Sequence, residues 1–376
     1  MDAQHLLAAC RDAGIDFYTG VPDSQLKGLC DTLYATLGVG GEHIVAANEG
    51  NAIGLCAGHF LATGKPALCY MQNSGLGNAV NPLASLMDGQ VYAMPCLMVI
   101  GWRGEPGVKD EPQHVKQGQV TLSQLELLDV PYMILDKQMT EEAFDEAFAQ
   151  LRAHLAANRT AAIVVRKGGL TCSLKPEYRN ASEMTREEAV GIIARLAGTK
   201  DVFVSTTGKL SRELFEMREA AGQGHARDFL TVGSMGHASS IALGVAMAQP
   251  TRRVWCLDGD GAALMHLGAM AVIGQRQPGN LVHVVINNGA HETVGGMPVC
   301  EGGMNLCAMA MAAGYRSVSR ADSPETLLRA VDAAMVGGGL AFIEVMCAVG
   351  AREDLGRPTT TPQENRDALM QFLRGE

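Results

Sequence analysis

Two short polar motifs, Gly259-Asp260-Gly261 and Asn287-Asn288, each follow an apolar run that is typical of a buried strand. The runs are 254–257 and 281–286, and a helical pattern lies between them. In a parallel sheet both polar ends fall at the same carboxyl edge, beside a helix N-terminus. A carboxylate and an amide oxygen suit Mg²⁺, and the glycines let backbone N–H groups approach a diphosphate closely. The spacing therefore predicts a magnesium diphosphate site.

The same motifs, with the continuation NNGAHETVGG over 287–296, resemble the thiamine diphosphate signature of the thiamine-dependent 2-oxo acid decarboxylases. The alternative is a turn and an Asn-rich hairpin in an unrelated α/β protein. Other phosphate motifs do not fit, because no GxGxxG opens a helix here and Gly208-Lys209 lacks the flanking residues of a P-loop. The resemblance implies thiamine diphosphate and Mg²⁺ as cofactors. It also implies that Asp260 and Asn288 bind the metal by side chain and Ala290 by its carbonyl.

Two further loops in this half follow strand patterns. Thr206 and Thr207 could bind the diphosphate through their hydroxyls, or they could only cap a helix. By resemblance, the segment 232–237 supplies a bulky apolar residue beneath the cofactor, and Met235 falls at that position. The cofactor-binding residues expected in this half are Thr206, Thr207, Gly208, Ser234, Met235, Gly259, Asp260, Gly261, Ala262 and Asn288.

In the N-terminal half, Glu49 follows the strand pattern 43–47 and opens a helix rich in small residues, for which Gly64 is a plausible stop. Glu49 could simply complement the helix dipole. The resemblance instead implies the carboxylate that bonds N1′ of the cofactor aminopyrimidine. Asn73 lies in a polar loop, 72–78, that is expected to face the pyrimidine but could be an ordinary turn.

Asp23 and Ser24 occupy a loop at the carboxyl end of a predicted strand. They could act only as a helix N-cap, whereas related decarboxylases carry an active-site acid in this loop. The long polar stretch 102–116 is a second candidate, because such loops are more often functional than structural. Its alternative is a solvated loop with mutually neutralising charges. By resemblance, His114 lies over the substrate, so Glu49, His114 and Asp23 are the expected catalytic residues.

An anionic substrate must overcome the overall negative charge of this protein, which makes local cations informative. The expected substrate-binding residues are Ser24, Lys27, Lys109 and His114. The sequence alone does not choose between these and three other cations, Arg103, Lys116 and Lys209.

The composition limits the possible classes of protein. A net charge of −10 over 376 residues argues against binding to nucleic acid or to anionic membrane surfaces. The ten cysteines lie mostly in apolar runs without CxxC spacing, as reduced core thiols do. No apolar stretch is long enough to span a bilayer, and residues 1–3 lack a basic n-region. We therefore expect a soluble cytoplasmic protein without membrane or nucleic-acid partners.

Both halves alternate strand and helix patterns, which predicts an α/β fold of two largely parallel sheets with helices on both faces. By resemblance these are a pyrimidine-binding domain at 1–166 and a diphosphate-binding domain at 186–376. The Gly- and Pro-containing linker, 167–185, is too short for a central domain, and Glu188 falls in a capping-box position after it. Family members join the two domains across subunits, so we expect a homodimer or higher homo-oligomer with the active site at the subunit interface.

The resemblance implies decarboxylation of 3-phosphonopyruvate to phosphonoacetaldehyde and CO₂, in phosphonate metabolism. Sulfopyruvate, the corresponding sulfonate, is an alternative substrate that the spacing does not exclude. A non-catalytic thiamine diphosphate-binding subunit is the alternative of a different class. Glu49 argues against it, because mere binding does not require that acid.

Overall fold

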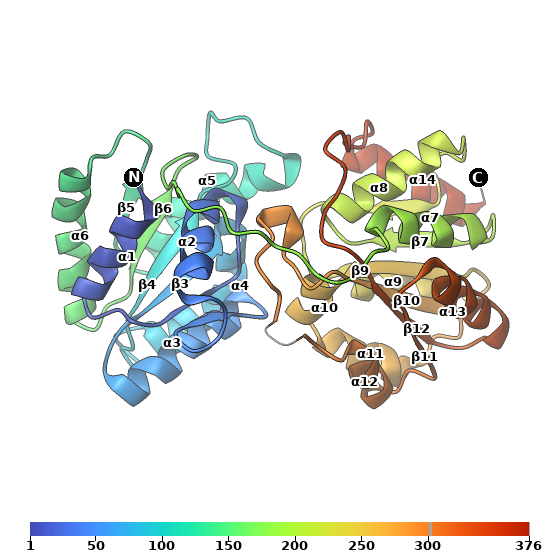
Figure 1. The fold of residues 1–376 in the computed structure, drawn as a ribbon, viewed down its shortest axis with the longest axis horizontal. Coiled ribbons are helices and arrows are strands. Elements are labelled where there is room, and N and C mark those ends of the chain that lie inside the picture. The colour runs from blue at the N-terminus through green and yellow to red at the C-terminus, as the bar shows by residue number, and fades with distance from the viewer. Residues whose placement is uncertain (301–302, 376) are drawn as a thin grey trace. The chain divides into compact units, whose positions relative to one another are not determined.

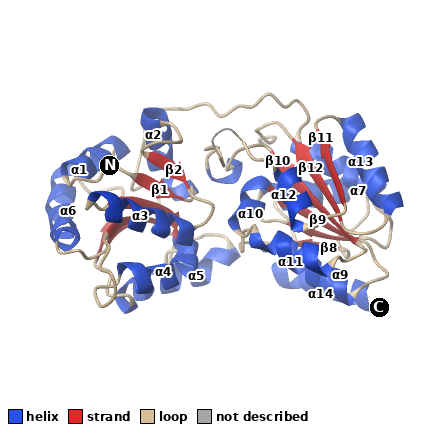
Figure 2. Cartoon of the chain, turned by 90° about the horizontal axis from the view of Figure 1, so that it is seen from below, coloured by secondary structure: helices blue, strands red, loops and turns tan. Residues whose placement is uncertain are grey.

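The computed structural model describes residues 1–300 and 303–375. The chain divides into two compact units, one formed by residues 1–177 with 291–301 and the other by 178–290 with 302–376. Each unit holds one six-stranded sheet in which every neighbouring pair is parallel (Figures 1 and 2). The prediction of two parallel α/β layers is therefore confirmed.

The first unit has the strand order β2-β1-β3-β4-β6-β5. Its strands are β1 (Tyr18–Gly20), β2 (His43–Val45), β3 (Ala67–Gln72), β4 (Cys96–Gly101), β5 (Tyr132–Leu135) and β6 (Ala161–Val165). Its helices are α1 (Ala3–Asp12), α2 (Lys27–Leu37), α3 (Glu49–Thr63), α4 (Leu76–Pro82), α5 (Pro112–Leu127) and α6 (Glu141–Ala156).

The second unit has the order β11-β12-β10-β9-β7-β8. Its strands are β7 (Val202–Ser205), β8 (Asp228–Leu230), β9 (Val254–Gly259), β10 (Leu281–Asn287), β11 (Ser317–Ala321) and β12 (Ala341–Met346). Its helices are α7 (Arg186–Leu196), α8 (Lys209–Ala220), α9 (Ala238–Ala248), α10 (Asp260–Met265), α11 (Gly268–Arg276), α12 (Leu306–Ala313), α13 (Pro324–Gly337) and α14 (Pro362–Arg374).

Strand β9 illustrates how helices come to cover both faces of a sheet. Successive side chains of a strand point to opposite faces. Trp255 and Leu257 belong to one apolar cluster with residues of α7, α8 and α13, and Cys256 belongs to another with residues of α9, α11 and α12. A strand buried on both faces must be apolar throughout, which explains the uninterrupted run in the sequence.

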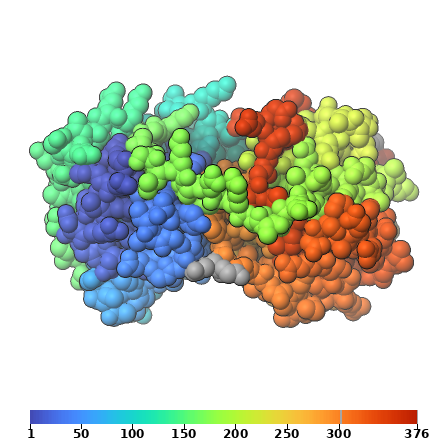
Figure 3. All heavy atoms as spheres, viewed as in Figure 1, coloured from blue at the N-terminus to red at the C-terminus, as the bar shows by residue number. Residues whose placement is uncertain are grey.

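Local signals set the ends of the helices that matter for the site. The Asn48 side chain accepts a hydrogen bond from the Asn51 N–H and caps α3, which ends at Gly64 in a left-handed conformation. Helix α7 begins with a capping box between Thr185 and Glu188, as the sequence predicts. The connection before it runs over the surface, where residues 171–183 are exposed or half-buried (Figure 3).

Residues 291–300, which follow the Asn287-Asn288 motif, group with the first unit, although they lie within the sequence range of the second. Met297 and Val299 are almost fully buried, and the Tyr70 hydroxyl donates to the Met297 sulfur at 3.8 Å. Burial of these apolar side chains explains why the segment packs there. Among the described residues, no helix combines the length and the apolar character needed to cross a bilayer.

A buried ion pair stabilises the second unit and gives a test of its packing. Arg218 of α8 makes two hydrogen bonds of 2.8 Å to the Asp228 carboxylate, and both side chains are fully buried. We expect Arg218→Met to lower the free energy of unfolding by about 3–5 kcal/mol, because it leaves a buried carboxylate without its partner. Urea unfolding followed by Trp255 fluorescence, in a Trp102→Phe background, measures this loss. The double variant Arg218→Met/Asp228→Leu should recover most of it, and a single-variant loss below about 1 kcal/mol would contradict the assignment.

Candidate active site

The candidate residues gather where the strand order reverses in each sheet. In the first sheet this point lies between β1 and β3, and in the second between β7 and β9. Ligands of open α/β sheets bind at the carboxyl ends of strands at such switch points. Asp23 and Asn73 follow β1 and β3, and Thr206 and Asp260 follow β7 and β9. Within each sheet, the topology thus brings together residues that are far apart in the sequence.

In the second unit, one hydrogen bond links the two polar motifs. Strands β9 and β10 pair so that Gly259 lies opposite Ile286, which places Asp260 beside the residues that follow β10. The Asp260 carboxylate accepts from the Gly261 N–H and from the Gly289 N–H, both at 2.7 Å. The predicted convergence of the aspartate with the asparagine pair is therefore observed.

The two asparagines have different environments. Asn287 donates to the buried Glu344 carboxylate at 2.8 Å, so its amide holds β10 to β12. Asn288 accepts from the Ala290 N–H at 3.1 Å, and its own carbonyl accepts from Asn180 at 2.8 Å. These contacts hold the loop that follows β10 in place.

The donor set fits a hard divalent cation. Burial raises the pKa of Asp260 to about 6, and backbone N–H bonds limit the shift. The hydrogen bonds to Asp260 come from backbone N–H groups, and Mg²⁺ would supply a positive charge beside this buried carboxylate. A Cβ at Gly289 would meet no other atom within 4 Å, so the backbone beside Asp260 is open to a ligand.

The loops after β7 and β8 form the rest of this edge. The Thr207 hydroxyl accepts from the Gly233 N–H at 3.0 Å and ties the two loops together. Gly236 has φ +86°, and a Cβ there would lie 2.7 Å from the His266 ring and 3.1 Å from the Ala262 carbonyl. Only glycine permits this approach, which sets the half-buried Met235 beside the first turns of α10.

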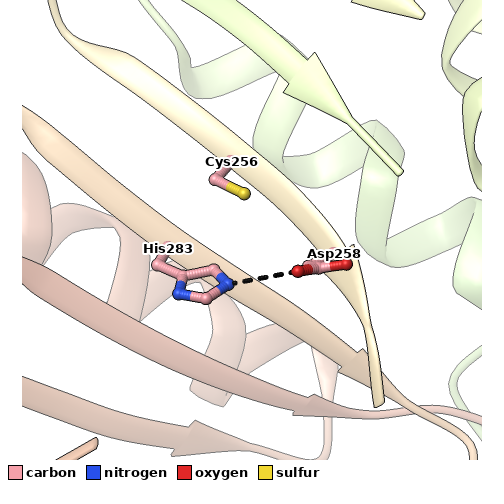
Figure 4. A group of neighbouring side chains, drawn as sticks. All are labelled: Cys256, Asp258 and His283. Carbon is pink, nitrogen blue, oxygen red and sulfur yellow. Dashed lines mark ion pairs between the residues drawn. The ribbon is translucent and has the colours of Figure 1, made fainter. Parts of the chain in front are cut away.

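A buried group beneath the motif contains Cys256, Asp258 and His283, whose ligand atoms lie within 4.8 Å of one another (Figure 4). Asp258 accepts from the Gly259 N–H at 3.0 Å and lies 3.5 Å from His283, which in turn contacts the Tyr315 hydroxyl at 3.0 Å. Burial raises the pKa of the Cys256 thiol well above its usual value, which disfavours the thiolate form that binds metals. We interpret the group as a brace for the backbone that precedes Asp260.

In the first unit, Glu49 is the first residue of α3 and is 5% exposed. The Asn78 amide of α4 donates to its carboxylate at 2.7 Å. Gly75 approaches so closely that a Cβ there would lie 2.4 Å from the Glu49 Cγ and 2.5 Å from Oε1. A neutral amide and a glycine therefore fix the carboxylate without placing a cation against it.

Asp23 is fully buried and caps the short helix at Ser24–Leu26. Its carboxylate accepts from the Gln72 amide at 2.6 Å and from the Gln25 N–H at 3.0 Å. Burial raises its pKa, and these hydrogen bonds limit the shift. Asp23 is therefore an N-cap and also a carboxyl group that holds its proton to higher pH than an exposed aspartate.

The stretch 102–116 is a loop only as far as Glu111, because Pro112 starts α5 and places His114 in its first turn. The Asp110 carboxylate organises the loop, accepting from Arg103 Nε at 2.8 Å and contacting His114 Nδ1 at 2.9 Å. Burial alone would raise the pKa of Asp110, but these bonds outweigh it and hold that pKa well below its usual range. With Nδ1 donating to Asp110, Nε2 is the nitrogen of His114 left for a substrate.

Asn73 has a structural role that the sequence did not predict. Its amide donates to the Arg103 carbonyl and to the Thr121 hydroxyl, both at 2.8 Å, and its oxygen accepts from the Arg103 N–H at 3.2 Å. The side chain is committed to bracing the loop after β4. A contact with a cofactor at this position would therefore come from the backbone of 73–75.

Asp110 and Gln72, which hold His114 and Asp23, were not among the predicted site residues. Asp110 had a usable signal, since it lies four residues before His114 at the start of a helix. Gln72 had no such signal, because its partner, Asp23, is 49 residues away in the sequence. The structure brings Ser24, Lys27 and Lys109 to one pocket of the first unit. Lys116 does not line that pocket, and Lys209 lies in the second unit.

Comparison with known proteins agrees with this geometry. Residues 2–127 match the N-terminal TPP binding domain of thiamine pyrophosphate enzymes, and residues 206–345 match the C-terminal TPP binding domain. The chain belongs to the thiamine pyrophosphate enzymes. The resemblance drawn from the GDG and NN motifs is thereby confirmed.

Within this family the chain is similar to decarboxylases over nearly its whole length. It is 34% identical to phosphonopyruvate decarboxylase of Streptomyces viridochromogenes over 99% of this chain and 94% of that protein. It is 27% identical to sulfopyruvate decarboxylase of Methanosarcina acetivorans over 92% of this chain and 91% of that protein. These similarities make it a carbon–carbon lyase of the carboxy-lyase class.

Separate alpha and beta subunits of sulfopyruvate decarboxylase from Methanothermobacter thermautotrophicus each match about a third of the chain. Both are 36% identical, over 35% of this chain and 75% of the alpha subunit, and over 36% of this chain and 71% of the beta subunit.

The metal assignment can be tested at Asp260. We expect Asp260→Ala to purify with less than about a tenth of the wild-type thiamine diphosphate, because the variant lacks the buried anion that would hold Mg²⁺. Protein-bound cofactor, measured as thiochrome fluorescence after dialysis against Mg²⁺ and thiamine diphosphate, gives the answer. Asp332→Ala, which removes an exposed carboxylate on α13, is the control. Equal cofactor content in both variants would exclude Asp260 as a metal ligand.

Proposed function

We propose that the chain catalyses the Mg²⁺-dependent decarboxylation of 3-phosphonopyruvate to phosphonoacetaldehyde and CO₂, in phosphonate metabolism. The observation that carries the proposal is its 34% identity to phosphonopyruvate decarboxylase over almost the full length of both proteins. The buried carboxylates at the carboxyl edges of both sheets support it. Glu49 would serve as the acid for the cofactor's pyrimidine and Asp260 as the acid for the metal.

When bound, thiamine diphosphate supplies the electron sink for the electrons released as CO₂ leaves. Glu49 would donate a hydrogen bond from its carboxyl group to N1′ of the aminopyrimidine, held in position by Asn78. Asp260 and Asn288 would bind Mg²⁺ by side chain and Ala290 by its carbonyl. The remaining cofactor contacts would come from the loops of the second unit, at Thr206, Thr207, Gly208, Ser234, Met235, Gly259, Gly261 and Ala262.

Asp23 and His114 would handle the substrate's protons. Burial raises the pKa of Asp23, so this acid can still carry a proton to deliver to the carbon that loses CO₂. The Nε2 atom of His114 would bind the substrate, because Asp110 holds the other ring nitrogen. Ser24, Lys27 and Lys109, which line one pocket, would contact the rest of the substrate.

Sulfopyruvate is the second candidate substrate. It differs from 3-phosphonopyruvate in carrying a sulfonate in place of the phosphonate, and a sulfopyruvate decarboxylase is 27% identical to this chain. A non-catalytic subunit is disfavoured, because Glu49 is held by a specific amide and a closely approaching glycine rather than left at the surface.

We also propose that the working form is a homodimer or higher homo-oligomer with the active site at the subunit interface. Glu49 lies in the first unit and Asp260 in the second. The relatives with separate alpha and beta subunits assemble from more than one chain, as their names state. The small-residue face of α3 lines an open apolar groove of about 650 Å³ with Phe17 and Leu55, and a second copy could cover it.

Comparative turnover tests the proposed reaction. We expect the wild type with Mg²⁺ and thiamine diphosphate to release CO₂ from 3-phosphonopyruvate with a higher kcat/KM than from sulfopyruvate or pyruvate. In Glu49→Gln, turnover should fall by about 10²–10⁴-fold on every substrate while cofactor binding persists, since the amide keeps the shape but not the acid–base function. Gly75→Ala should reduce turnover in the same way, because the added methyl group displaces the Glu49 side chain.

The substrate comparison tests which 2-oxo acid is used, and the Glu49→Gln variant tests the role of the carboxylate. A wild type that prefers sulfopyruvate would replace the substrate assignment and keep the reaction. Wild-type activity in Glu49→Gln would show that its carboxylate only complements the dipole of α3.

Mixing two inactive variants tests the shared active site. Glu49→Gln and Asp260→Ala should together regain about a quarter of wild-type activity after subunit exchange, because half of the dimers would be mixed and each would hold one intact site. The measurement is CO₂ release after mild dissociation and reassociation, with each variant alone as the control. A fully active species that sediments as a monomer would refute this arrangement.

A further inference from the structure

A pocket of about 380 Å³ opens in the first unit, at the carboxyl ends of β1, β4 and β6. Ser24 and Lys27 line it after β1, Arg103 and Lys109 after β4, and Lys167 after β6. Three chain segments that are more than 50 residues apart in the sequence therefore direct cations to one cavity. The protein as a whole carries a net charge of −10, so this concentration of positive charge is local.

Most charges around the pocket already have partners. Asp110 holds Arg103 through two hydrogen bonds, and Lys27 pairs with Asp31. Glu105, the other acid that lines the pocket, contacts Arg166 at 2.7 Å. Both acids that line the pocket, Glu105 and Asp110, are therefore paired with a cation of the protein.

Lys109 and Lys167 differ from these residues. Within the described part of the chain, neither has a hydrogen-bond or ion-pair partner, and both are exposed at the pocket. Two positive charges are therefore uncompensated in one cavity. A group with two negative charges and several acceptor oxygens would neutralise both, and ammonium groups bind such oxyanions as point charges.

The pocket also adjoins the residues proposed for the chemistry. Ser24 follows Asp23, and its hydroxyl accepts from Arg103 Nη1 at 2.9 Å. Arg103 shares the Asp110 carboxylate with His114. A ligand that also bonds the Ser24 hydroxyl would thus be connected through Arg103 and Asp110 to His114, and would lie one residue along the chain from Asp23.

We propose that this pocket binds the dianionic phosphonate of the substrate, with Lys109 and Lys167 as the residues that select it. The inference rests on the proposed decarboxylation and adds a residue, Lys167, that no sequence motif singled out. Ser24 offers a neutral hydrogen bond to the same group. Lys27 and Arg103 set the shape and field of the pocket, since their own carboxylate partners already compensate them.

The test compares Lys109→Met and Lys167→Met on three substrates that share the 2-oxo acid and differ in the tail. We expect each variant to raise KM for 3-phosphonopyruvate by about 10–100-fold, the effect of removing a charge-assisted hydrogen bond. KM for sulfopyruvate, whose tail carries one charge, should rise less, and the kinetics on pyruvate should not change. Lys167→Arg should retain most of the affinity.

Lys116→Met is the matched control, because it removes the same charge from an exposed residue of α5 that does not line the pocket. It should leave all three KM values unchanged. Equal losses on 3-phosphonopyruvate and pyruvate, or an equal effect of Lys116→Met and Lys167→Met, would overturn the assignment.

Direct binding separates failure of this inference from failure of the proposed function. If the wild type turns over none of the three substrates, the decarboxylation proposal fails. The pocket is then tested by calorimetric titration of the full chain with methylphosphonate. Binding that is lost in Lys109→Met/Lys167→Met and kept in Lys116→Met would support the phosphonate site. Absent binding in the wild type, or undiminished binding in the double variant, would overturn it.

Discussion

The parallel pairing of neighbouring strands is the constraint on which the rest of the structure depends. Parallel strands present their carboxyl ends at one edge, so the residues that follow them must share that edge. The register of β9 on β10 sets Gly259 opposite Ile286, and the Asp260 carboxylate can then accept from the Gly289 N–H. In the first sheet, β1 lies between β2 and β3, and the same rule brings Asp23 between the residues that follow those strands.

Three carboxylates at these edges differ in their partners, and the partners indicate their roles. Asp110 is paired with Arg103, which keeps it ionised and makes it a structural anchor. Asp23 and Glu49 are held by the neutral amides of Gln72 and Asn78. Burial raises the pKa of Asp23, so this carboxyl group holds its proton to higher pH than an exposed aspartate. The protein thus combines a paired, ionised anchor with carboxyl groups held by neutral amides.

Some of the site could be predicted from residue types and local spacing, and some could not. The Gly259-Asp260-Gly261 and Asn287-Asn288 motifs could be recognised, because each follows an apolar strand pattern and parallel pairing brings both to one sheet edge. The helical start at Pro112 could also have been predicted, since proline favours the first helical position. The 102–116 stretch was instead expected to be a loop throughout. Asn73 was expected at the cofactor, but its amide braces Arg103 and Thr121, and that commitment depends on contacts with distant segments.

The sequence by itself determined the fold class and the family, because apolar periodicity and the GDG and NN motifs are local properties of the chain. It also predicted Glu49 and Asp23 as candidate acids, since both follow strand patterns. Only the tertiary structure decided which cations remain uncompensated. Lys27, Lys109 and Lys167 line the same pocket, and among the described residues Lys27 pairs with Asp31 whereas neither Lys109 nor Lys167 has an ion-pair partner. Charge compensation acts through space, and strand topology rather than sequence distance decides which charges meet.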